Sequence, residues 1–259
     1  MTAIRLKAWS TLLREKVRPL VHPRIYRDGQ RVFEDRKRFY GSFLKPGNRV
    51  FDIGANLGNR VSVFLALNTS VVACEPQSYC YHFLKLKFGR AITLVNAAMG
   101  SAKGRLTMYI NPDSSTISSL SQEWINKVRT NRFKGQQWNN TQEVDVDTLD
   151  AMIVRYGKPD FIKIDVEGFE VEVLNGLSVP VAMVCFEYTI PEQTTQVFRC
   201  LERLHALSPN YRYNFSLEES NQFVFNQWKS YDDMVTQLTS GIDIFQAFGD
   251  IYARLESQE

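Results

Sequence analysis

The stretch that decides the fold reads VFDIGANLGN and occupies residues 50–59. An apolar run of strand length leads into a turn that carries Gly54 and Gly58, and a helical pattern follows. Glycine allows a backbone to turn tightly and to approach a ligand closely. In open α/β sheets such turns lie at the carboxyl ends of strands, where ligands bind. The stretch therefore predicts a strand, a ligand-binding turn and a helix, in that order.

The same alternation of short apolar runs and helical patterns continues along the chain. We expect strands at Arg49–Ile53, Val71–Cys74, Ile92–Ala97, Phe161–Ile164 and Met183–Glu187. We expect helices near Arg60–Leu67, Ser78–Phe88, Thr148–Tyr156, Phe169–Asn175 and Thr194–Leu207. Continuous apolar runs are typical of strands whose two faces are both covered. The pattern predicts a doubly wound α/β fold with a mostly parallel sheet.

Two further segments complete the predicted sheet and its surroundings. Tyr211–Leu217 and Gln222–Trp228 flank a short link and predict a C-terminal antiparallel hairpin. Residues 101–147 form an insertion with strand-like alternation at Arg105–Ile110 and Glu143–Val146 and a polar stretch between them. An insertion of this length in a compact domain is typical of a lid or a substrate loop.

The two ends of the chain differ from its centre. We expect a basic helical arm over residues 1–45, a main domain over 46–230 and a helical tail over 231–259, interrupted at Gly241 and Gly249. In the arm, Pro19 and Pro23 should end the first helix, and a second helix should cover Arg31 to Leu44. The arm should pack on the main domain through its apolar stripe.

Charge is distributed unevenly between the arm and the rest. Residues 1–40 hold eleven Lys and Arg against four Asp and Glu, which gives +7. The whole chain is +3, so the remainder is +3 − 7 = −4. A basic arm on an acidic body favours an anionic partner, either a lipid surface or a negatively charged substrate. The acidic body is unlike a nucleic-acid-binding protein.

The composition favours a cytoplasmic protein, free or at a membrane surface. No apolar run is long enough to span a bilayer, and the N-terminus lacks the pattern of a secretory signal. The cysteines Cys74, Cys80, Cys185 and Cys200 show neither CxxC nor metal-type spacing.

Two carboxylates narrow the type of ligand. Asp52 precedes the turn and would repel a pyrophosphate, but it suits a cationic ligand of the methionine type. Glu75 ends the next expected strand about 20 residues on, where a carboxylate can accept hydrogen bonds from ribose hydroxyls. The chain has neither the G-x-G-x-x-G turn of dinucleotide folds nor a phosphate-binding P-loop. The alternative is an ordinary strand-to-helix turn without a ligand.

Further motifs give the sequence a resemblance to a known protein family. Between Asp160 and Glu170 the chain reads DFIKIDVEGFE, which is a strand, a group of carboxylates and the start of a helix. Together with FDIGANLGN (51–59), CEP (74–76), NAAMG (96–100) and VDTLD (146–150), it resembles the FkbM family of methyltransferases over about residues 48–190. The resemblance implies a Rossmann-like class I methyltransferase fold with seven strands. It also implies S-adenosylmethionine as the methyl donor and O-methylation as the usual reaction.

The resemblance further assigns residues to the cofactor. The methionine part would be surrounded by Asp52, Gly54, Asn56 and Gly58, and Ala55 in the same turn would also bind the cofactor. Glu75 would bind the ribose, Asn96 and Ala97 would lie near the adenine, and Asp165 would lie close to the transferred methyl group.

Catalysis on an alcohol needs a group that accepts its proton. Asp165 and Glu187 end two strands that we expect to be adjacent, and Glu167 lies in the following turn. Clustered carboxylates raise one another's pKa, which would suit a base. The alternative is that they orient the cofactor's amino group or cap a helix. The same oxygens could hold Mg²⁺, but nothing in their spacing requires it, and we expect no metal. Lys163 is expected to be their charge partner.

These observations favour an S-adenosylmethionine-dependent methyltransferase that acts on a hydroxyl of a sugar, a glycolipid or a secondary metabolite. An RNA or protein methyltransferase is the first alternative, although the Asn/Asp-Pro-Pro-Tyr arrangement of amino-group methylation is absent. From other classes, an NAD-dependent oxidoreductase and a non-catalytic binding module remain. The expected partner is a small-molecule or glycan acceptor.

Overall fold

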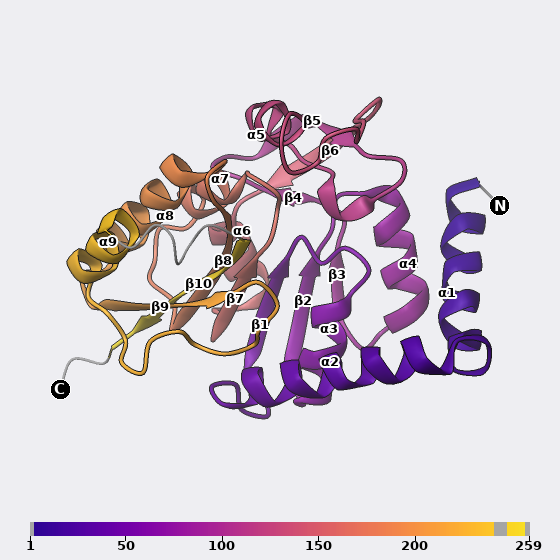
Figure 1. The fold of residues 1–259 in the computed structure, drawn as a ribbon, viewed down its shortest axis with the longest axis horizontal. Coiled ribbons are helices and arrows are strands. Elements are labelled where there is room, and N and C mark those ends of the chain that lie inside the picture. Colours follow the sequence, from indigo (N-terminus) through magenta and orange to yellow (C-terminus); the bar gives the residue numbers. More distant parts are fainter. Residues whose placement is uncertain (1–2, 241–247, 257–259) are drawn as a thin grey trace.

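A seven-stranded open sheet forms the centre of the protein in a computed structural model, which describes residues 3–240 and 248–256 (Figure 1). The strand order is β3-β2-β1-β7-β8-β10-β9, and β10 is antiparallel to both of its neighbours. The strands are β1 (Arg49–Ile53), β2 (Ser70–Cys74), β3 (Thr93–Val95), β7 (Phe161–Ile164), β8 (Met183–Thr189), β9 (Tyr211–Leu217) and β10 (Phe248–Leu255). The predicted doubly wound, mostly parallel sheet is confirmed.

Helices cover both faces of this sheet, and two apolar cores separate them from it. One core lies under α2 (Pro23–Gly41), α3 (Asn59–Ala66) and α4 (Ser78–Phe88). The other lies under α6 (Leu149–Tyr156), α7 (Glu170–Asn175), α8 (Thr194–Leu207) and α9 (Tyr231–Ser240). Neighbouring strand residues alternate between the two, because Val50 belongs to the first core and Phe51 to the second.

The insertion forms a smaller sheet of its own. Its strands β5 (Gly104–Ile110) and β6 (Asn140–Asp147) are joined by β4 (Ala98–Met99), which directly precedes the insertion, and the order is β4-β6-β5. The 3₁₀ turn η1 (Ser115–Ile117) and the helix α5 (Gln122–Val128) lie between β5 and β6. Figure 1 places this unit over the end of the central sheet to which β1 and β2 point. The two predicted strands are confirmed, and they pair with each other rather than with the central sheet.

The basic arm consists of two helices that pack on the main domain. The helix α1 (Ala3–Val21) lies against α4, and α2 lies against α3 (Figure 1). The prediction that Pro19 ends the first helix is wrong, because α1 continues through it to Val21. Pro23 begins α2, eight residues before the predicted start at Arg31. Proline suits a first helical position, since its fixed φ is helical and its missing N–H has no partner there.

The tail was predicted to be helical, which holds for Tyr231–Ser240 and is wrong for Phe248–Leu255. The latter segment is β10, which pairs antiparallel with β9. Antiparallel C-terminal strands are therefore present as predicted, but the predicted hairpin partner Gln222–Trp228 is wrong, because α9 lies between the two strands that pair. Because β10 lies between two strands, its central residues 249–253 are buried on both faces and show no alternation. The predicted interruption at Gly241 lies outside the described residues.

The segment Gln222–Trp228 has the composition of a strand but a different role. Phe223 packs in the core, with its ring centroid 4.9 Å from that of Phe39. Asn214 fixes the segment from β9, because its side chain bonds to both the N–H and the carbonyl of Phe225. Burial of aromatic rings, not a ladder of backbone hydrogen bonds, explains this composition. Within the described ranges, no helix has the length and apolar character needed to cross a membrane.

Candidate functional site

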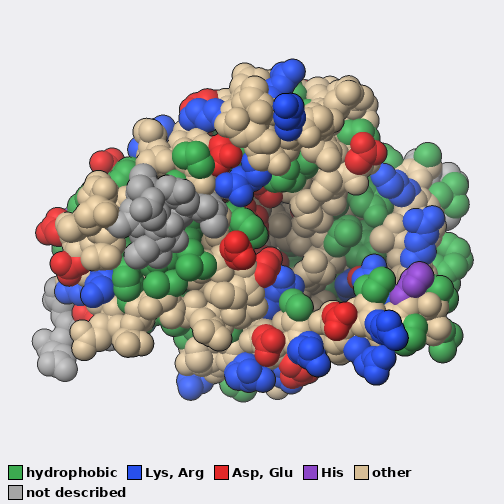
Figure 2. All heavy atoms as spheres, in the orientation of Figure 1, with side chains coloured by type: hydrophobic (Ala, Val, Ile, Leu, Met, Phe, Trp, Pro, Cys, Tyr) green, Lys and Arg blue, Asp and Glu red, His purple; other side chains and the backbone are tan. Residues whose placement is uncertain are grey.

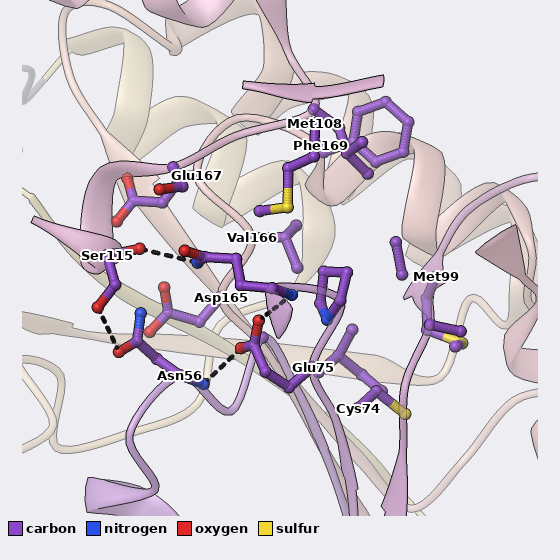
Figure 3. Close-up of a pocket in the computed structure, with 18 of the residues that line it drawn as sticks. Asn56, Cys74, Glu75, Met99, Met108, Ser115, Asp165, Val166, Glu167 and Phe169 are labelled. Carbon is purple, nitrogen blue, oxygen red and sulfur yellow. Dashed lines mark hydrogen bonds between the residues drawn. The ribbon is translucent and has the colours of Figure 1, made fainter. Parts of the chain in front are cut away.

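Two adjoining cavities lie at the carboxyl ends of β1, β2 and β7. The first, which we call the inner pocket, encloses about 480 Å³ between the central sheet and the insertion (Figure 3). The second, which we call the outer cleft, opens beside it toward α2 and α3. The cavities share the residues Gly54, Asn56, Thr116, Asp165 and Glu167. Such a position is the usual ligand site of open α/β sheets.

The glycine turn after β1 brings two strand ends together. Gly54 has φ +85°, and a Cβ there would collide with the carbonyl oxygen of Asp165 at the end of β7. Asn56 also has positive φ, +47°, and its backbone N–H points at the end of β2. Glycine at position 54 is therefore required both by the backbone conformation and by the approach of β7.

Glu75 lies buried at the end of β2, with 2% of its surface exposed. Its Oε2 accepts from the N–H of Asn56 at 2.7 Å and its Oε1 from the N–H of Gln77 at 2.7 Å. Burial raises the pKa of this carboxyl to about 7, although the two N–H groups act to lower it. Each oxygen keeps lone pairs that can accept a ribose hydroxyl.

The opposite wall of the inner pocket is apolar. Met99, Met108, Val166 and Phe169 line it (Figure 3), and Ala97 also lines the pocket. Apolar and aromatic side chains of this kind suit a flat base such as adenine. The pocket therefore offers a carboxylate for a ribose and an apolar surface for a base.

Asp52 supplies the third feature that the cofactor needs. It lines the outer cleft with 2% of its surface exposed, and its Oδ2 has no hydrogen-bond partner. Burial raises its pKa to about 7, against the attraction of Lys163. A buried carboxylate without a partner is costly, and a cationic ligand group removes that cost. The ammonium group of a methionine part fits here, so the residues present fit S-adenosylmethionine.

Three carboxylates meet in the outer cleft. One oxygen each of Asp165, Glu167 and Glu187 lie within 4.8 Å of one another, a spacing that one divalent cation could bridge. The absence of a metal stays a prediction. Asp165 directly follows β7, and β7 and β8 are adjacent as expected. The prediction that β8 ends at Glu187 is wrong, because the strand continues to Thr189.

Lys163 divides the carboxylates into two types. Its Nζ lies 3.2 Å from Asp165 Oδ2, which confirms its predicted role as a charge partner for that residue, and 3.0 Å from Asp250 Oδ1, a partner that was not predicted. Burial would raise the pKa of Asp165, but Lys163 and Arg60 outweigh it and the pKa is lowered. Burial raises the pKa of Glu187, and the charges of Asp165 and Glu167 raise it further. Burial and the charges of Asp165 and Glu170 raise the pKa of Glu167 as well. Asp165 is thus held ionised, while Glu167 and Glu187 take a proton more readily.

The turn after Asp165 is conformationally demanding. Glu167 has φ +55° and Gly168 has φ +90°, and a Cβ at position 168 would collide with the Trp124 side chain of α5. Glu170 Oε1 accepts from the N–H groups of Val166 and Gly168 at 3.3 and 3.1 Å. A non-glycine residue at positive φ is uncommon and concentrates at functional sites.

Most of the predicted site residues line one of the two cavities. The inner pocket contains Gly54, Asn56, Glu75, Ala97 and Asp165, and the outer cleft contains Asp52, Ala55 and Glu187. Among the described residues that line these cavities, Gly58 and Asn96 do not occur. Gly58 instead leaves room for Phe88 and Leu84 of α4. Asn96 supports the site from behind, since its Nδ2 donates to the backbone oxygen of Glu75 at 2.9 Å.

Several lining residues had no signal in the sequence. Arg36 of α2 and Arg60 of α3 both bind Glu219, and all three line the outer cleft. Ser115 of the insertion donates to Asn56 Oδ1 at 3.1 Å. These residues come from parts of the chain that are far apart in sequence. Arginine and serine are also common on protein surfaces, so their presence in the sequence does not indicate a site. Only the positions of whole elements could have revealed them.

Comparison with solved structures shows methyltransferases among the similar ones. The precorrin-6y C5,15-methyltransferase of Geobacter metallireducens is 13% identical, with a TM-score of 0.43 and 84% of each chain covered. A TehB-like S-adenosylmethionine-dependent methyltransferase of Corynebacterium glutamicum is 8% identical, with a TM-score of 0.45, covering 96% of this chain and 98% of that one. Likenesses of this size carry no argument about function. No curated protein matches the sequence.

The sequence matches a family of methyltransferases over most of its length. The model of the methyltransferase FkbM domain matches residues 52–235, well over half of the chain. The match begins at Asp52, before the glycine turn, and contains Glu75, the DFIKIDVEGFE stretch and Glu187. The chain therefore belongs to the FkbM family of methyltransferases.

Proposed function

We propose that the protein transfers a methyl group from S-adenosylmethionine to a hydroxyl of a small-molecule or glycan acceptor. The observation that carries the proposal is the pair of Asp165, which lines both cavities, and Glu187, which lines the outer cleft beside it. One carboxyl of this pair is held ionised by Lys163, and the other has a raised pKa. An ionised carboxylate can bind a cation, and a carboxylate with a raised pKa can accept a proton, so the pair suits both tasks.

The chain's residues hold the cofactor in three places. Glu75 accepts the ribose hydroxyls, Phe169 and Met108 contact the base, and Asp52 pairs with the ammonium group. When bound, S-adenosylmethionine supplies a sulfonium methyl group whose carbon–sulfur bond breaks as the carbon–oxygen bond to the acceptor forms. Alignment of the two reactants can contribute roughly 7–11 kcal/mol.

The outer cleft then serves the acceptor. Glu187 takes the proton that the hydroxyl loses, and Asp165 stays negative beside the reacting centre. Thr116, Arg36 and Arg60 offer hydrogen-bond donors to an oxygen-rich molecule, and both arginines also pair with Glu219. These polar lining groups support a sugar, a glycolipid or a hydroxylated secondary metabolite as the acceptor.

Two measurements test this proposal in order. The first is calorimetric titration with S-adenosylhomocysteine, with NAD as the control ligand. We expect micromolar binding of the first and none of the second. The second is incubation with methyl-labelled S-adenosylmethionine and separate panels of hydroxylated metabolites, glycolipids, RNA and proteins. Label in the first two panels supports the proposal, whereas label only in RNA or protein contradicts it.

The proposed base has its own test. Glu187→Gln keeps the size of the side chain but cannot take the proton, so kcat should fall by about 10²–10⁴-fold. Affinity for S-adenosylhomocysteine should stay within about twofold if the residue acts only on the acceptor. The matched control is Glu172→Gln on α7, away from the cavities. A weakened cofactor affinity with little loss of kcat would instead assign Glu187 to the cofactor's amino group.

A further inference from the structure

The helix α1 turns one face toward the domain. Ala8 is completely buried. Thr11 Oγ1 accepts from the hydroxyl of Tyr79 at 2.9 Å, and Glu15 pairs with Lys87 at 2.9 Å. Tyr79 and Lys87 belong to α4, so these contacts fix the rotation of α1 about its axis.

The opposite face is apolar and exposed. At 100° per residue, the side chains of Leu6, Trp9, Leu13, Val17 and Leu20 fall together on the side away from α4. We call these five residues the outer face of α1. They are between 38% and 85% exposed, with Leu20 the most exposed. A contiguous apolar stripe on a protein surface marks a site of interaction.

Basic side chains flank this outer face on both sides. By the same rotation, Arg5 and Lys16 border one edge, and Arg14 borders the other. Lys7 lies farther round the helix, with its Nζ 4.9 Å from the centre of the Tyr79 ring of α4. Glu15 is the single acid of the helix, and it is engaged on the inner side by Lys87. Figure 2 shows Lys and Arg side chains spread along the edge of the molecule that α1 and α2 form, with hydrophobic ones among them.

A shallow pocket adjoins the outer face. It is lined by Arg5, His82 and Lys85 together with Trp9 and Leu86. Basic groups and apolar groups at one spot match a molecule that has an anionic head and an apolar body, as a phospholipid does.

We propose that the outer face of α1 docks on an anionic phospholipid membrane. The apolar stripe enters the acyl boundary while the flanking Arg and Lys contact lipid phosphates. A second copy of the chain is the poorer occupant, because its outer face would bring the same positive charges against these. The proposal concerns where the protein sits and does not depend on which acceptor it methylates.

The test uses the full chain and lipid vesicles. We expect co-flotation with vesicles of phosphatidylcholine mixed with phosphatidylglycerol, and much weaker co-flotation with phosphatidylcholine alone. Leu6→Ser combined with Leu13→Ser should weaken binding by about tenfold or more, since both side chains leave water on docking. Val154→Ser is the matched control, because Val154 is 88% exposed on α6, outside the arm.

The charge contribution is tested separately. Arg14→Gln and Lys16→Gln should each weaken binding to the mixed vesicles by about fivefold, and added salt should do the same. Lys158→Gln, an exposed lysine elsewhere, should have no effect. Unchanged affinity for S-adenosylhomocysteine shows that each variant is folded. The proposal is overturned if the mixed vesicles do not bind or if the serine variants bind as well as the parent. A dimer that these variants disrupt, without vesicle binding, would also overturn it.

Discussion

Glu75 shows how one side chain joins the scaffold to the ligand. Both of its oxygens already accept backbone N–H groups, one from the glycine turn and one from the start of α4. The carboxylate thus fixes the ends of β1 and β2 relative to each other before any ligand arrives. Its remaining lone pairs face the inner pocket, so positioning and recognition reside in the same group.

Replacement of this carboxylate should weaken cofactor binding. In Glu75→Gln the amide keeps the side chain's size, but one oxygen that could accept a ribose hydroxyl becomes a donor. We expect S-adenosylhomocysteine to bind about tenfold more weakly, which corresponds to about 1.5 kcal/mol. Isothermal titration measures the change, with the exposed Glu34→Gln as control. An unaltered dissociation constant in a folded Glu75→Gln protein would remove the ribose assignment.

Residues in the glycine turn were predictable because their chemistry is local. Asp52, Gly54 and Glu75 lie on or beside strands whose apolar runs are unmistakable, and strand ends fix where they meet. Arg60 and Glu219 were not predictable, because 159 positions separate them and neither has a local reason to be polar or apolar. Residues that meet only through the tertiary fold cannot be identified from a single sequence.

At the scale of elements, Lys163 connects strands that are not neighbours. It lies on β7, and its partner Asp250 lies on β10, with β8 between them. The ammonium group is completely buried, and the two carboxylates beside it offset the free-energy cost of removing its charge from water. The charge state of Asp165 therefore depends on a strand far along the chain.

Removal of this cation should be costly. Lys163→Met leaves Asp165 and Asp250 without their partner, and we expect a loss of about 3–5 kcal/mol in the free energy of unfolding. Urea denaturation measures it. Combining Lys163→Met with Asp250→Asn should restore part of the loss, since a neutral amide no longer needs a cation. If the double variant is no more stable than the single one, the pair is not the source of the effect.

β10 also explains where prediction of the elements failed. Central strands such as β1 and β7 are mostly apolar, apart from Arg49, Asp52 and Lys163, and were predicted with correct bounds. β10 reads FGDIYARL, with a glycine, an acid and an arginine. Gly249 fits there because a Cβ would collide with the carbonyl of Ser216 on β9, and Asp250 is there for Lys163. The polar residues of β10 are explained by tertiary contacts, which a periodic pattern in the sequence does not reveal.

At the scale of the whole molecule, stability and cofactor binding should respond oppositely to pH. The pKa values of Asp52 and Glu75 rise to about 7 on folding, so the native state holds their protons where the unfolded chain has lost them. Their contribution to stability is thus present at low pH and lost as pH rises through about 7. Cofactor binding needs both groups ionised and should strengthen over the same interval.

A double variant isolates this effect. Asp52→Asn with Glu75→Gln cannot ionise, so its melting temperature should rise relative to that of the parent between about pH 5 and about pH 8. Over the same interval, the parent should bind S-adenosylhomocysteine more tightly at higher pH, and the variant should show no such trend. A constant difference in melting temperature would mean that the two carboxyls do not titrate in this range.

The place of β10 between β8 and β9 has a consequence for synthesis on the ribosome. β9 is made before β10 but pairs with it and not with β8, so both strands wait with open edges until residues 248–255 have left the exit tunnel. An unpaired strand edge invites pairing with another chain. Nascent chains therefore expose these edges in the interval between the synthesis of β9 and that of β10, and chaperones that shield strand edges would act in that interval.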